Sequence, residues 1–321
     1  MRHRALGKTG LTVSEVGMGT WPLAGALNIA GRPFGYGEVS EDQALATIKQ
    51  ALDGGVTLFD TADFYGLGRA EHYLGAALAT TPEAQIVTKA GYIPDGRDGT
   101  CVDVSREHLI AALKRSLKRL KREAVDIFLV HVVPTSAEAW QGASEALSVM
   151  KREGLARHTG LSVAASFDNA APYLDDPTIE VVEVYYNLFF NRFADTIHAQ
   201  VRERNLGVLV ASPFGRGILS NAFDATRRYG DDDVRRDWSA DSPRHKADLD
   251  RRARVEDICA RNGVKVGDAA LSFSLALDGV SCVIPGMRTA EHVAANLAFA
   301  NGPAVSDTVL TALQAASEAG T

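Results

Sequence analysis

Short apolar runs recur along this chain, and segments of helical period separate most of them. The runs are rich in Val, Ile and Leu, and eight can be read from the sequence: Glu15–Gly19, Val56–Asp60, Ile86–Lys89, Val125–His131, His158–Ser162, Val181–Tyr186, Gly207–Ser212 and Ser281–Pro285. The intervening segments space their apolar residues as a helix does: Glu41–Ala51, Arg69–Ala79, Arg106–Lys121, Ser136–Lys151, Ala194–Arg204 and Ala290–Ala300. This alternation predicts parallel βαβ units with both faces of the sheet covered. Eight units in 321 residues fit an α/β fold, the closed (β/α)8 TIM barrel.

The two ends of the chain have their own patterns. Residues 3–13 read as two short strands around a Lys-Thr-Gly turn, which predicts an N-terminal β-hairpin that plugs the bottom of the barrel. Asp307–Ser317 has helical spacing and predicts an extra C-terminal helix packed outside. We expect residues 1–321 to form one barrel domain, because barrels of this length are usually single.

Serines and glycines mark several of the predicted helix ends. Ser40, Ser105 and Ser136 each precede a helical segment with an acidic residue in its first turn, which predicts N-caps. Asp53-Gly54-Gly55 is a typical C-terminal stop for the first helix.

Composition narrows the classes of partner. Hydrophobic residues make up 46% of the chain and charged residues 23%, as in ordinary globular proteins. A net charge of -6 gives no reason to expect nucleic acid or an anionic membrane as a partner. No stretch reaches about 18 apolar residues, and the N-terminus lacks the apolar segment of a signal peptide.

The cysteines and histidines add to this picture. Cys101, Cys259 and Cys282 are scattered and odd in number, which favours a reducing compartment. The histidines show no clustered metal-ligand spacing, so no metal site is expected. We therefore expect a cytoplasmic protein. Whether it is a monomer or a homo-oligomer is left open.

Four chemically useful side chains follow successive predicted strands. Asp60 ends one strand and Tyr65 comes five residues later, while Lys89 and His131 end the next two. Tyrosine has an ordinary pKa of about 10. A nearby ammonium stabilises the phenolate, a carboxylate holds that ammonium in place, and a histidine can donate a hydrogen bond to a substrate oxygen. Together the four would suit protonation of a carbonyl oxygen while hydride arrives at the carbonyl carbon.

Each of these residues alone has an ordinary structural interpretation. Asp60 is a plausible turn or cap residue, Lys89 a solvated charge at a strand end, and His131 a hydrogen-bonded structural histidine. Their position at the same end of successive strands favours a shared site. In a barrel that end carries the active site.

The same residues belong to a longer resemblance: the chain resembles an aldo-keto reductase over essentially its whole length. The matching segments occur in the same order and spacing as in that family: Arg4–Leu11, Gly17–Trp21, Phe59–Ala62, Tyr65-Gly66, Ser116–Leu120, Asp126–His131, Gly160–Ser162, Tyr186–Leu188, Ser212–Gly215 with Gly217, and Ile284–Gly286.

The resemblance implies a (β/α)8 barrel that binds NADP(H) in an extended form, NAD(H) being the lesser expectation. It implies a catalytic tetrad of Asp60, Tyr65, Lys89 and His131. Tyr65 would be the general acid, Lys89 and Asp60 would tune it, and His131 would orient the carbonyl. The reaction implied is NADPH-dependent reduction of an aldehyde or ketone by direct hydride transfer, or the reverse oxidation of an alcohol.

Cofactor positions carry over from the family along six strand ends. They are Gly19, Thr20, Asp60, Ser162, Asn187, Ser212, Pro213, Phe214, Gly215, Gly217, Leu219, Ile284, Gly286, Arg288, His292 and Asn296. Ser162 and Asn187 are expected at the nicotinamide carboxamide, although ordinary strand-end hydrogen bonding is the alternative. Arg288 suits the adenosine 2′-phosphate because its guanidinium presents a fork of donors.

The chain departs from the family pattern at several cofactor positions. Val163 stands where an asparagine is common, and Ala211 where an aromatic residue stacks on the nicotinamide. Some members also place a lysine and a serine at Gly286 and Met287, and an arginine at His292.

The expected substrate contacts are Trp21, Tyr65, His131 and Trp238. Trp21 lies in a long first loop with Phe34 and Tyr36. Trp238 lies in a segment dense in Arg and Asp, Arg227–Arg254, which reads as a solvated insertion. Because this insertion follows the seventh strand, it should overhang the active-site face and could close over cofactor or substrate.

Two alternatives stay open at this point. The first is an NADP(H)-binding regulatory or subunit-like barrel that keeps the tetrad but turns over slowly or not at all. The second is a dedicated sugar or secondary-metabolite reductase, whose substrate loops the sequence does not resolve.

Overall fold

Eight parallel strands form the centre of the molecule. The computed structural model describes residues 1–97 and 99–318. Its main sheet has the order β14-β13-β12-β11-β10-β7-β6-β3. The strands are β3 (Met18–Gly19), β6 (Leu58–Asp60), β7 (Gln85–Ala90), β10 (Val125–Val130), β11 (Ala156–Ala164), β12 (Val181–Tyr185), β13 (Gly207–Ala211) and β14 (Val280–Ile284). Parallel bridges from Val16 to Val283 and from Gly19 to Gly286 join the first strand to the last. Each predicted run overlaps one strand of this sheet, and the (β/α)8 barrel is confirmed.

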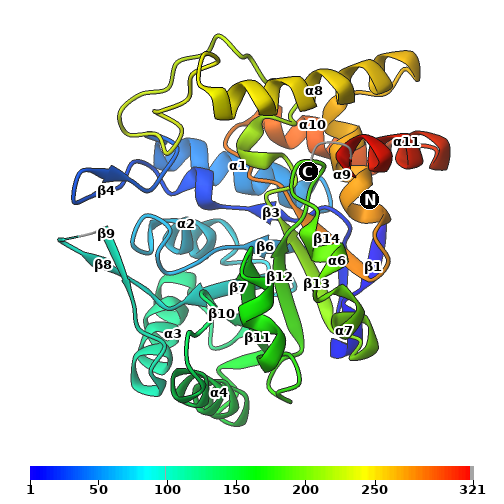
Figure 1. Cartoon of the computed structure of the whole chain (residues 1–321). Coiled ribbons are helices and arrows are strands. Elements are labelled where there is room, and N and C mark those ends of the chain that lie inside the picture. The colour runs from blue at the N-terminus through cyan, green and yellow to red at the C-terminus, as the bar shows by residue number, and fades with distance from the viewer. Residues whose placement is uncertain (98, 319–321) are drawn as a thin grey trace.

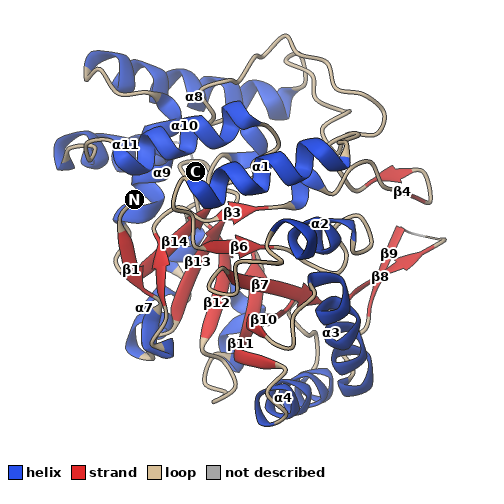
Figure 2. Cartoon of the chain, turned by 180° about the vertical axis from the view of Figure 1, so that it is seen from behind, coloured by secondary structure: helices blue, strands red, loops and turns tan. Residues whose placement is uncertain are grey.

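Helices cover the outside of this barrel (Figures 1 and 2). Those that match predicted segments are α1 (Glu41–Asp53), α2 (Arg69–Ala77), α3 (Arg106–Leu120), α4 (Ala137–Arg152) and α10 (Ala290–Asn301). Ser40, Ser105 and Ser136 each accept a hydrogen bond from the backbone N–H three residues on, at 3.1 to 3.3 Å. All three predicted N-caps are therefore present. None of the helices in the described part of the chain is long and apolar enough to cross a membrane.

The predicted helix over 194–204 is instead two short helices, α6 (Arg192–Asp195) and α7 (His198–Glu203). Thr196 separates them with a ψ of -91°, outside the helical region. Its hydroxyl donates to the Arg192 carbonyl at 2.7 Å. Such local side-chain bonds compete with the regular helical ladder, which the apolar spacing alone does not reveal.

Several elements were not predicted. The helices are α5 (Phe167–Ala170), α8 (Pro243–Arg261) and α9 (Val266–Ala276), and the hairpins are β4 (Asn28–Ile29) with β5 (Arg32–Pro33) and β8 (Tyr92–Asp95) with β9 (Gly99–Val102). The first turns of α8 are rich in charges of both signs, so that part of the sequence reads as solvated loop. Arg252 on this helix is nevertheless buried and donates to the Ser220 carbonyl at 3.2 Å. The predicted insertion therefore includes a packed helix.

The N-terminal hairpin closes one end of the barrel, as predicted. β1 (His3–Ala5) pairs antiparallel with β2 (Thr12–Ser14). Leu6 and Val13 are fully buried in an apolar cluster whose other fully buried members come from the barrel strands: Leu58, Val87, Ile127, Leu129, Val181, Leu209 and Cys282. A Cβ on Gly207 would lie 2.7 Å from Leu6 Cγ. Glycine is thus required where the plug meets β13.

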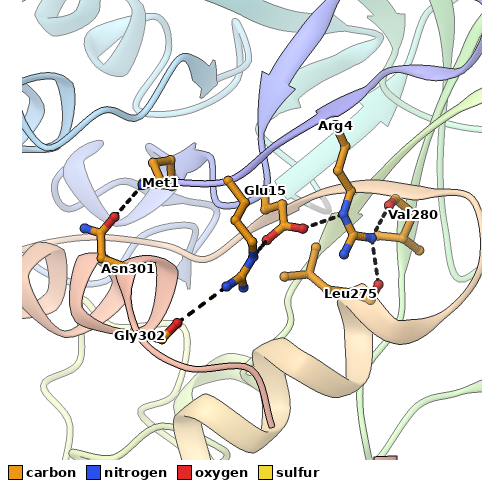
Figure 3. A network of polar contacts seen from close by, with 8 residues as sticks. Met1, Arg4, Glu15, Leu275, Val280, Asn301 and Gly302 are labelled. Atoms are coloured by element: carbon orange, nitrogen blue, oxygen red, sulfur yellow. Dashed lines mark hydrogen bonds and ion pairs between the residues drawn. The ribbon is translucent and has the colours of Figure 1, made fainter. Parts of the chain in front are cut away.

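Polar contacts fix the N-terminal hairpin to α9 and β14 (Figure 3). Arg2 and Arg4 both donate to Glu15, each at 2.6 Å. Arg4 also donates to the carbonyls of Leu275 and Val280, at 2.8 and 3.0 Å. These bonds tie the first strand to the end of α9 and to the last barrel strand.

The predicted C-terminal helix is α11 (Asp307–Glu318), which packs against α8 and α9 (Figure 1). Val309 and Leu313 are its buried contacts.

Candidate active site

Alternate side chains of each strand point into the barrel, and toward the carboxyl end of the strands these inward side chains change from apolar to polar. Leu58, Val87 and Val181 belong to the interior cluster. The residues two positions further on, Asp60, Lys89 and Glu183, point to the same face of their strands. Likewise His131 follows Leu129. The carboxyl end of the barrel thus gathers the charged residues in one layer.

Lys89 is the centre of this layer. It is fully buried, and its Nζ donates to Asp60 Oδ2 and, at 2.9 Å, to Glu183 Oε2. Glu183 Oε1 accepts a further hydrogen bond from Ser162 Oγ at 3.0 Å. Burial alone would lower the pKa of Lys89, but the two carboxylates outweigh it and raise that pKa. Lys89 is therefore charged at neutral pH.

Tyr65 lies beside this ammonium, with the Lys89 Nζ 5.4 Å from the centre of its ring. Burial raises the pKa of Tyr65 well above its ordinary value, Lys89 lowers it, and Asp60 and Glu183 raise it again. The sequence predicted the lowering by Lys89, which is present but outweighed. The phenol is consequently protonated across the neutral range.

His131 faces the edge of Tyr65, with ring centres 5.7 Å apart. Burial first, and then the charge on Lys89, lower the pKa of His131 well below its ordinary value. The imidazole is therefore neutral at pH 7. Its Nδ1 is buried and has no hydrogen-bond partner among the described residues.

Aromatic side chains surround Tyr65 and His131. Trp21 stacks on Tyr65 with 5.9 Å between ring centres, and Tyr92 meets the His131 ring edge-on at 5.0 Å. Tyr36 meets Trp21 edge-on at 5.0 Å. Three of the four predicted substrate-contact residues, Trp21, Tyr65 and His131, therefore come together.

Trp238 lies elsewhere. Its ring packs against Phe223 and His245, with ring centres 5.6 and 4.3 Å away. This cluster joins the segment between β13 and α8 to the first turn of α8. The contact of Trp238 with substrate stays a prediction.

A cavity of about 670 Å³ adjoins this layer, between the first loop, the loop after β13 and the start of α10. Half of the predicted cofactor positions line it: Ser212, Pro213, Phe214, Gly217, Gly286, Arg288, His292 and Asn296. Its other lining residues include the cations Arg216, Arg227 and Arg235, against the acids Asp268 and Glu291. The cavity is therefore suited in charge to an anionic ligand.

The remaining predicted cofactor positions lie around the cavity or beneath it. Thr20 Oγ1 donates to the Asp60 carbonyl at 2.8 Å, and Gly19 bridges to Gly286. Gly215 begins a short 3-10 helix with a φ of 52°, while Leu219 and Ile284 are buried in the apolar core. These five residues shape the site through backbone and packing contacts.

Ser162 and Asn187 are engaged within the protein. Asn187 Nδ2 donates to the Ser212 carbonyl at 2.9 Å, and its Oδ1 accepts from the backbone N–H groups of Phe189 and Phe190. Ser162 donates to Glu183, as described above. The strand-end alternative raised from the sequence thus describes their contacts in this structure.

The first loop and the insertion meet at the cavity. Tyr36 and Asp233 form an antiparallel bridge, and the Val234 N–H donates to the Gly35 carbonyl at 2.8 Å. Arg288 donates to the carbonyls of Tyr36 and Glu38, at 2.5 and 2.7 Å. The insertion therefore lies against one wall of the cavity, and Arg288 is held by the same loop.

Glu183, Arg227, Arg235 and Tyr92 were not predicted as site residues. A signal existed for Glu183, since it is the one charge within the run Val181–Tyr185 and shares the interior face with Val181. The arginines of the insertion read as ordinary solvated charge, and their place at the cavity depends on the fold of a long loop.

Comparison with known proteins agrees with this architecture. The model of the Aldo/keto reductase family matches residues 15–318. The chain is 30% identical over 306 residues to L-galactose dehydrogenase of Arabidopsis thaliana, covering 92% of this chain and 86% of that protein. It is 26% identical over 317 residues to the NADH-specific methylglyoxal reductase of Escherichia coli, covering 94% of each. The solved glycerol dehydrogenase of Gluconobacter oxydans superposes with a TM-score of 0.82 at 22% identity, covering 98% of this chain and 94% of that one.

The barrel and its charged upper layer define a (β/α)8 protein with a candidate active site at the carboxyl ends of its strands. The chain belongs to the aldo/keto reductase family and is an oxidoreductase of that family.

Proposed function

We propose that this protein reduces an aldehyde or ketone with NADPH, or oxidises the corresponding alcohol, and that Tyr65 is its general acid. The observation that carries the proposal is the buried ammonium of Lys89 beside the Tyr65 ring, paired with Asp60. In the proposed complex, a protonated phenol, a fixed ammonium and a neutral imidazole would surround the carbonyl oxygen of the substrate. Of the functions considered, carbonyl reduction uses all four side chains.

Each side chain has a distinct task in this proposal. The cofactor supplies the hydride when it is bound. Tyr65 donates its phenolic proton to the carbonyl oxygen, and the ammonium of Lys89 stabilises the phenolate that remains. Asp60 holds Lys89, and the His131 ring donates a hydrogen bond to the same oxygen. In the direction of alcohol oxidation, Tyr65 accepts the proton instead.

The charge of the cavity supports NADP(H) as the cofactor. Arg227, Arg235 and Arg288 all line it, and a guanidinium binds phosphate through parallel donors. A dianionic 2′-phosphate would be neutralised better there than a ribose hydroxyl. The relative from Escherichia coli is NADH-specific, so the preference has to be measured for this chain.

The aromatic wall supports a small carbonyl substrate. Trp21, Tyr36 and Tyr92 offer flat apolar faces near Tyr65 and His131, and the phenol groups of Tyr36 and Tyr92 can bind hydroxyl groups. The Trp21 indole N–H already donates to the Phe34 carbonyl at 3.1 Å. The names of the relatives include a sugar dehydrogenase and a methylglyoxal reductase. We propose short aldehydes and aldoses as the first substrates to test. A cytoplasmic location is also proposed, because Cys259 and Cys282 are buried and unpaired.

The test is the loss of NADPH absorbance on mixing the protein with aldehydes, ketones and aldoses, with NADH in parallel. Turnover that prefers NADPH is expected. If neither cofactor is oxidised, a fluorescence titration with NADPH separates a binding-only barrel from a protein that binds no cofactor. Either of those results would reject the proposed reductase for the substrates tested.

A separate substitution tests the preference for NADPH over NADH. Arg288→Ala should lower the preference for NADPH over NADH by about tenfold, the effect of one charge-assisted hydrogen bond. Arg236→Ala is the matched control, because Arg236 lies in the insertion, donates to the Gly31 carbonyl and does not line the cavity. Equal losses in the two variants would count against a phosphate contact at Arg288.

A further inference from the structure

Lys89 has two carboxylate partners. Asp60 is the partner that the sequence predicts, and Glu183 on β12 is the second, at 2.9 Å from the Lys89 Nζ. The Glu183 side chain is 5% exposed. Its other oxygen accepts the proton of Ser162 Oγ. One buried side chain thus connects the ammonium of the tetrad to a residue predicted at the cofactor.

A second buried carboxylate is costly for the fold alone. The single positive charge of Lys89 cannot balance both Asp60 and Glu183 in a buried layer, so the two carboxylates either carry an excess negative charge or retain a proton. Buried charges without full compensation destabilise proteins. A glutamine would make the same two contacts without that charge, since its amide has one acceptor and two donors. The charge itself therefore needs a role.

We propose that Glu183 is a positioning residue that holds Lys89 jointly with Asp60, offsets its positive charge at Tyr65, and links it through Ser162 to the cofactor side of the site. This inference rests on the proposed function for its kinetic consequence, but its electrostatic part can be tested without turnover.

The surroundings of Glu183 support an electrostatic role. Titratable groups interact electrostatically with Glu183 from its own strand, from neighbouring strands and from the loop after β6: Asp60, Tyr65, Lys89 and Tyr185. His131 interacts with Lys89, and Arg216 with Tyr185. Burial first and Glu183 second raise the pKa of Asp60 well above its ordinary value. Glu183 also raises the pKa of Tyr65, after burial and Asp60. Both effects favour the protonated forms of Asp60 and Tyr65.

The kinetic test is the pH profile of carbonyl reduction in Glu183→Gln. Glutamine retains the shape and both contacts, so the variant is expected to fold. Reduction requires protonated Tyr65, and kcat/KM falls at the alkaline limb where the free enzyme loses that proton. Without the charge of Glu183, that limb should move to lower pH by about one unit. A purely structural role would lower activity without moving the limb.

Two further variants serve as controls. Glu180→Gln makes the same chemical change just before β12, where Glu180 pairs with Lys151 and His158 instead of the tetrad. Its profile should match the wild type. Glu183→Asp keeps the charge, so its alkaline limb should stay within a few tenths of a pH unit even if kcat falls. An equal shift in the Asp and Gln variants would overturn the proposal.

Thermal unfolding tests the same charge without any substrate. The raised pKa of Asp60 stabilises the fold below the ordinary Asp pKa, and this contribution is lost as pH rises through the folded value. In Glu183→Gln the pKa of Asp60 is less raised, so less stability is lost. The Tm of the variant relative to wild type should therefore increase from pH 5 to pH 8. A difference that does not change with pH overturns the inference.

The two measurements separate two kinds of failure. If the wild type oxidises neither cofactor but the pH-dependent Tm difference is present, the proposed function fails and the coupling of Glu183 to Asp60 stands. If the enzyme turns over and the alkaline limb is unmoved in Glu183→Gln, the reductase stands and the role of Glu183 is rejected.

Discussion

Tyr65 is half-buried and has three charged neighbours, and these decide its protonation state. Burial, Asp60 and Glu183 together outweigh Lys89, so the phenol holds its proton at neutral pH. Tyr65→Phe removes only that hydroxyl and leaves the ring stacked on Trp21. We expect kcat for carbonyl reduction to fall by about 10²-fold or more, the lower end of a general-acid contribution. Steady-state rates of the purified variant check this.

The affinity for NADPH should be nearly unchanged in Tyr65→Phe, because the cavity is lined by other residues. Fluorescence titration of the cofactor is the control. Full turnover in this variant would contradict the mechanism.

Asp63 provides a second prediction at this scale. Its carboxyl is largely buried, its Oδ1 has no hydrogen-bond partner among the described residues, and burial, then Glu71, raise its pKa to about 7. An acid with a raised folded pKa stabilises the protein below its ordinary pKa, near 4, and that stability is lost as pH rises toward 7. Asp63→Asn should therefore unfold at a higher temperature than wild type at pH 8, with a smaller advantage at pH 5. Calorimetry at both pH values checks it, and an advantage larger at pH 5 would contradict it.

At the scale of elements, the N-terminal hairpin is predicted to contribute directly to the barrel core. Leu6 is fully buried and packs directly against Gly207 of β13, where a side chain in place of the glycine hydrogen would collide with it. Leu6→Ala should lower the free energy of unfolding by about 2–5 kcal/mol, the usual cost of truncating a buried leucine. Denaturant titration measures this value.

Thr12→Ala is the matched control for that experiment, because Thr12 is exposed on the partner strand of the same hairpin. A change within about 0.5 kcal/mol is expected for such a surface position. Equal losses of stability in the two variants would mean that strand propensity, and not burial in the core, explains the effect of Leu6→Ala.

Whether an element could be predicted depends on how close together in sequence the residues are that determine it. The helices capped by Ser40, Ser105 and Ser136 begin where predicted because the cap and the first turn are neighbours in sequence. The break at Thr196 accompanies hydrogen bonds from its hydroxyl to the carbonyls of Arg192 and Phe193, which apolar spacing does not report. Helix α8 could not be predicted because it packs against α11, which is far from it in sequence.

For the whole molecule, the contact between the insertion and the first loop matters most. Val234 donates to Gly35, and Arg235 stacks on the Tyr36 ring at 4.8 Å, beside the cavity. A ligand in that cavity should hold the two segments together. We expect saturating NADPH to slow tryptic cleavage at the exposed Arg227 and Arg228 several-fold, with mass spectrometry locating the cuts.

Cleavage at Lys121 is the internal control for this experiment. Lys121 is exposed at the C-terminal end of α3, away from the cavity. NADPH should leave its rate unchanged. An equal effect at all three sites would mean global stabilisation and not closure of the insertion.

The sequence by itself determined the barrel and its plug, and it predicted the four residues that we propose as the catalytic tetrad. Strands and helices of a (β/α)8 barrel are read from short-range periodicity, and parallel strands bring their carboxyl ends to one face whatever the loops do. Asp60, Lys89 and His131 could be predicted together because each stands at such an end.

Only the tertiary structure decided the electrostatics of the site and the walls around it. The protonation of Tyr65 depends on the sum of burial and three charges from three strands, and the sign of that sum is not a property of any segment. Glu183 meets Lys89 because β12 lies across the barrel from β7, and Arg235 reaches the cavity because a long loop folds back on Tyr36. Long-range packing sets such contacts, and local sequence patterns carry no record of them.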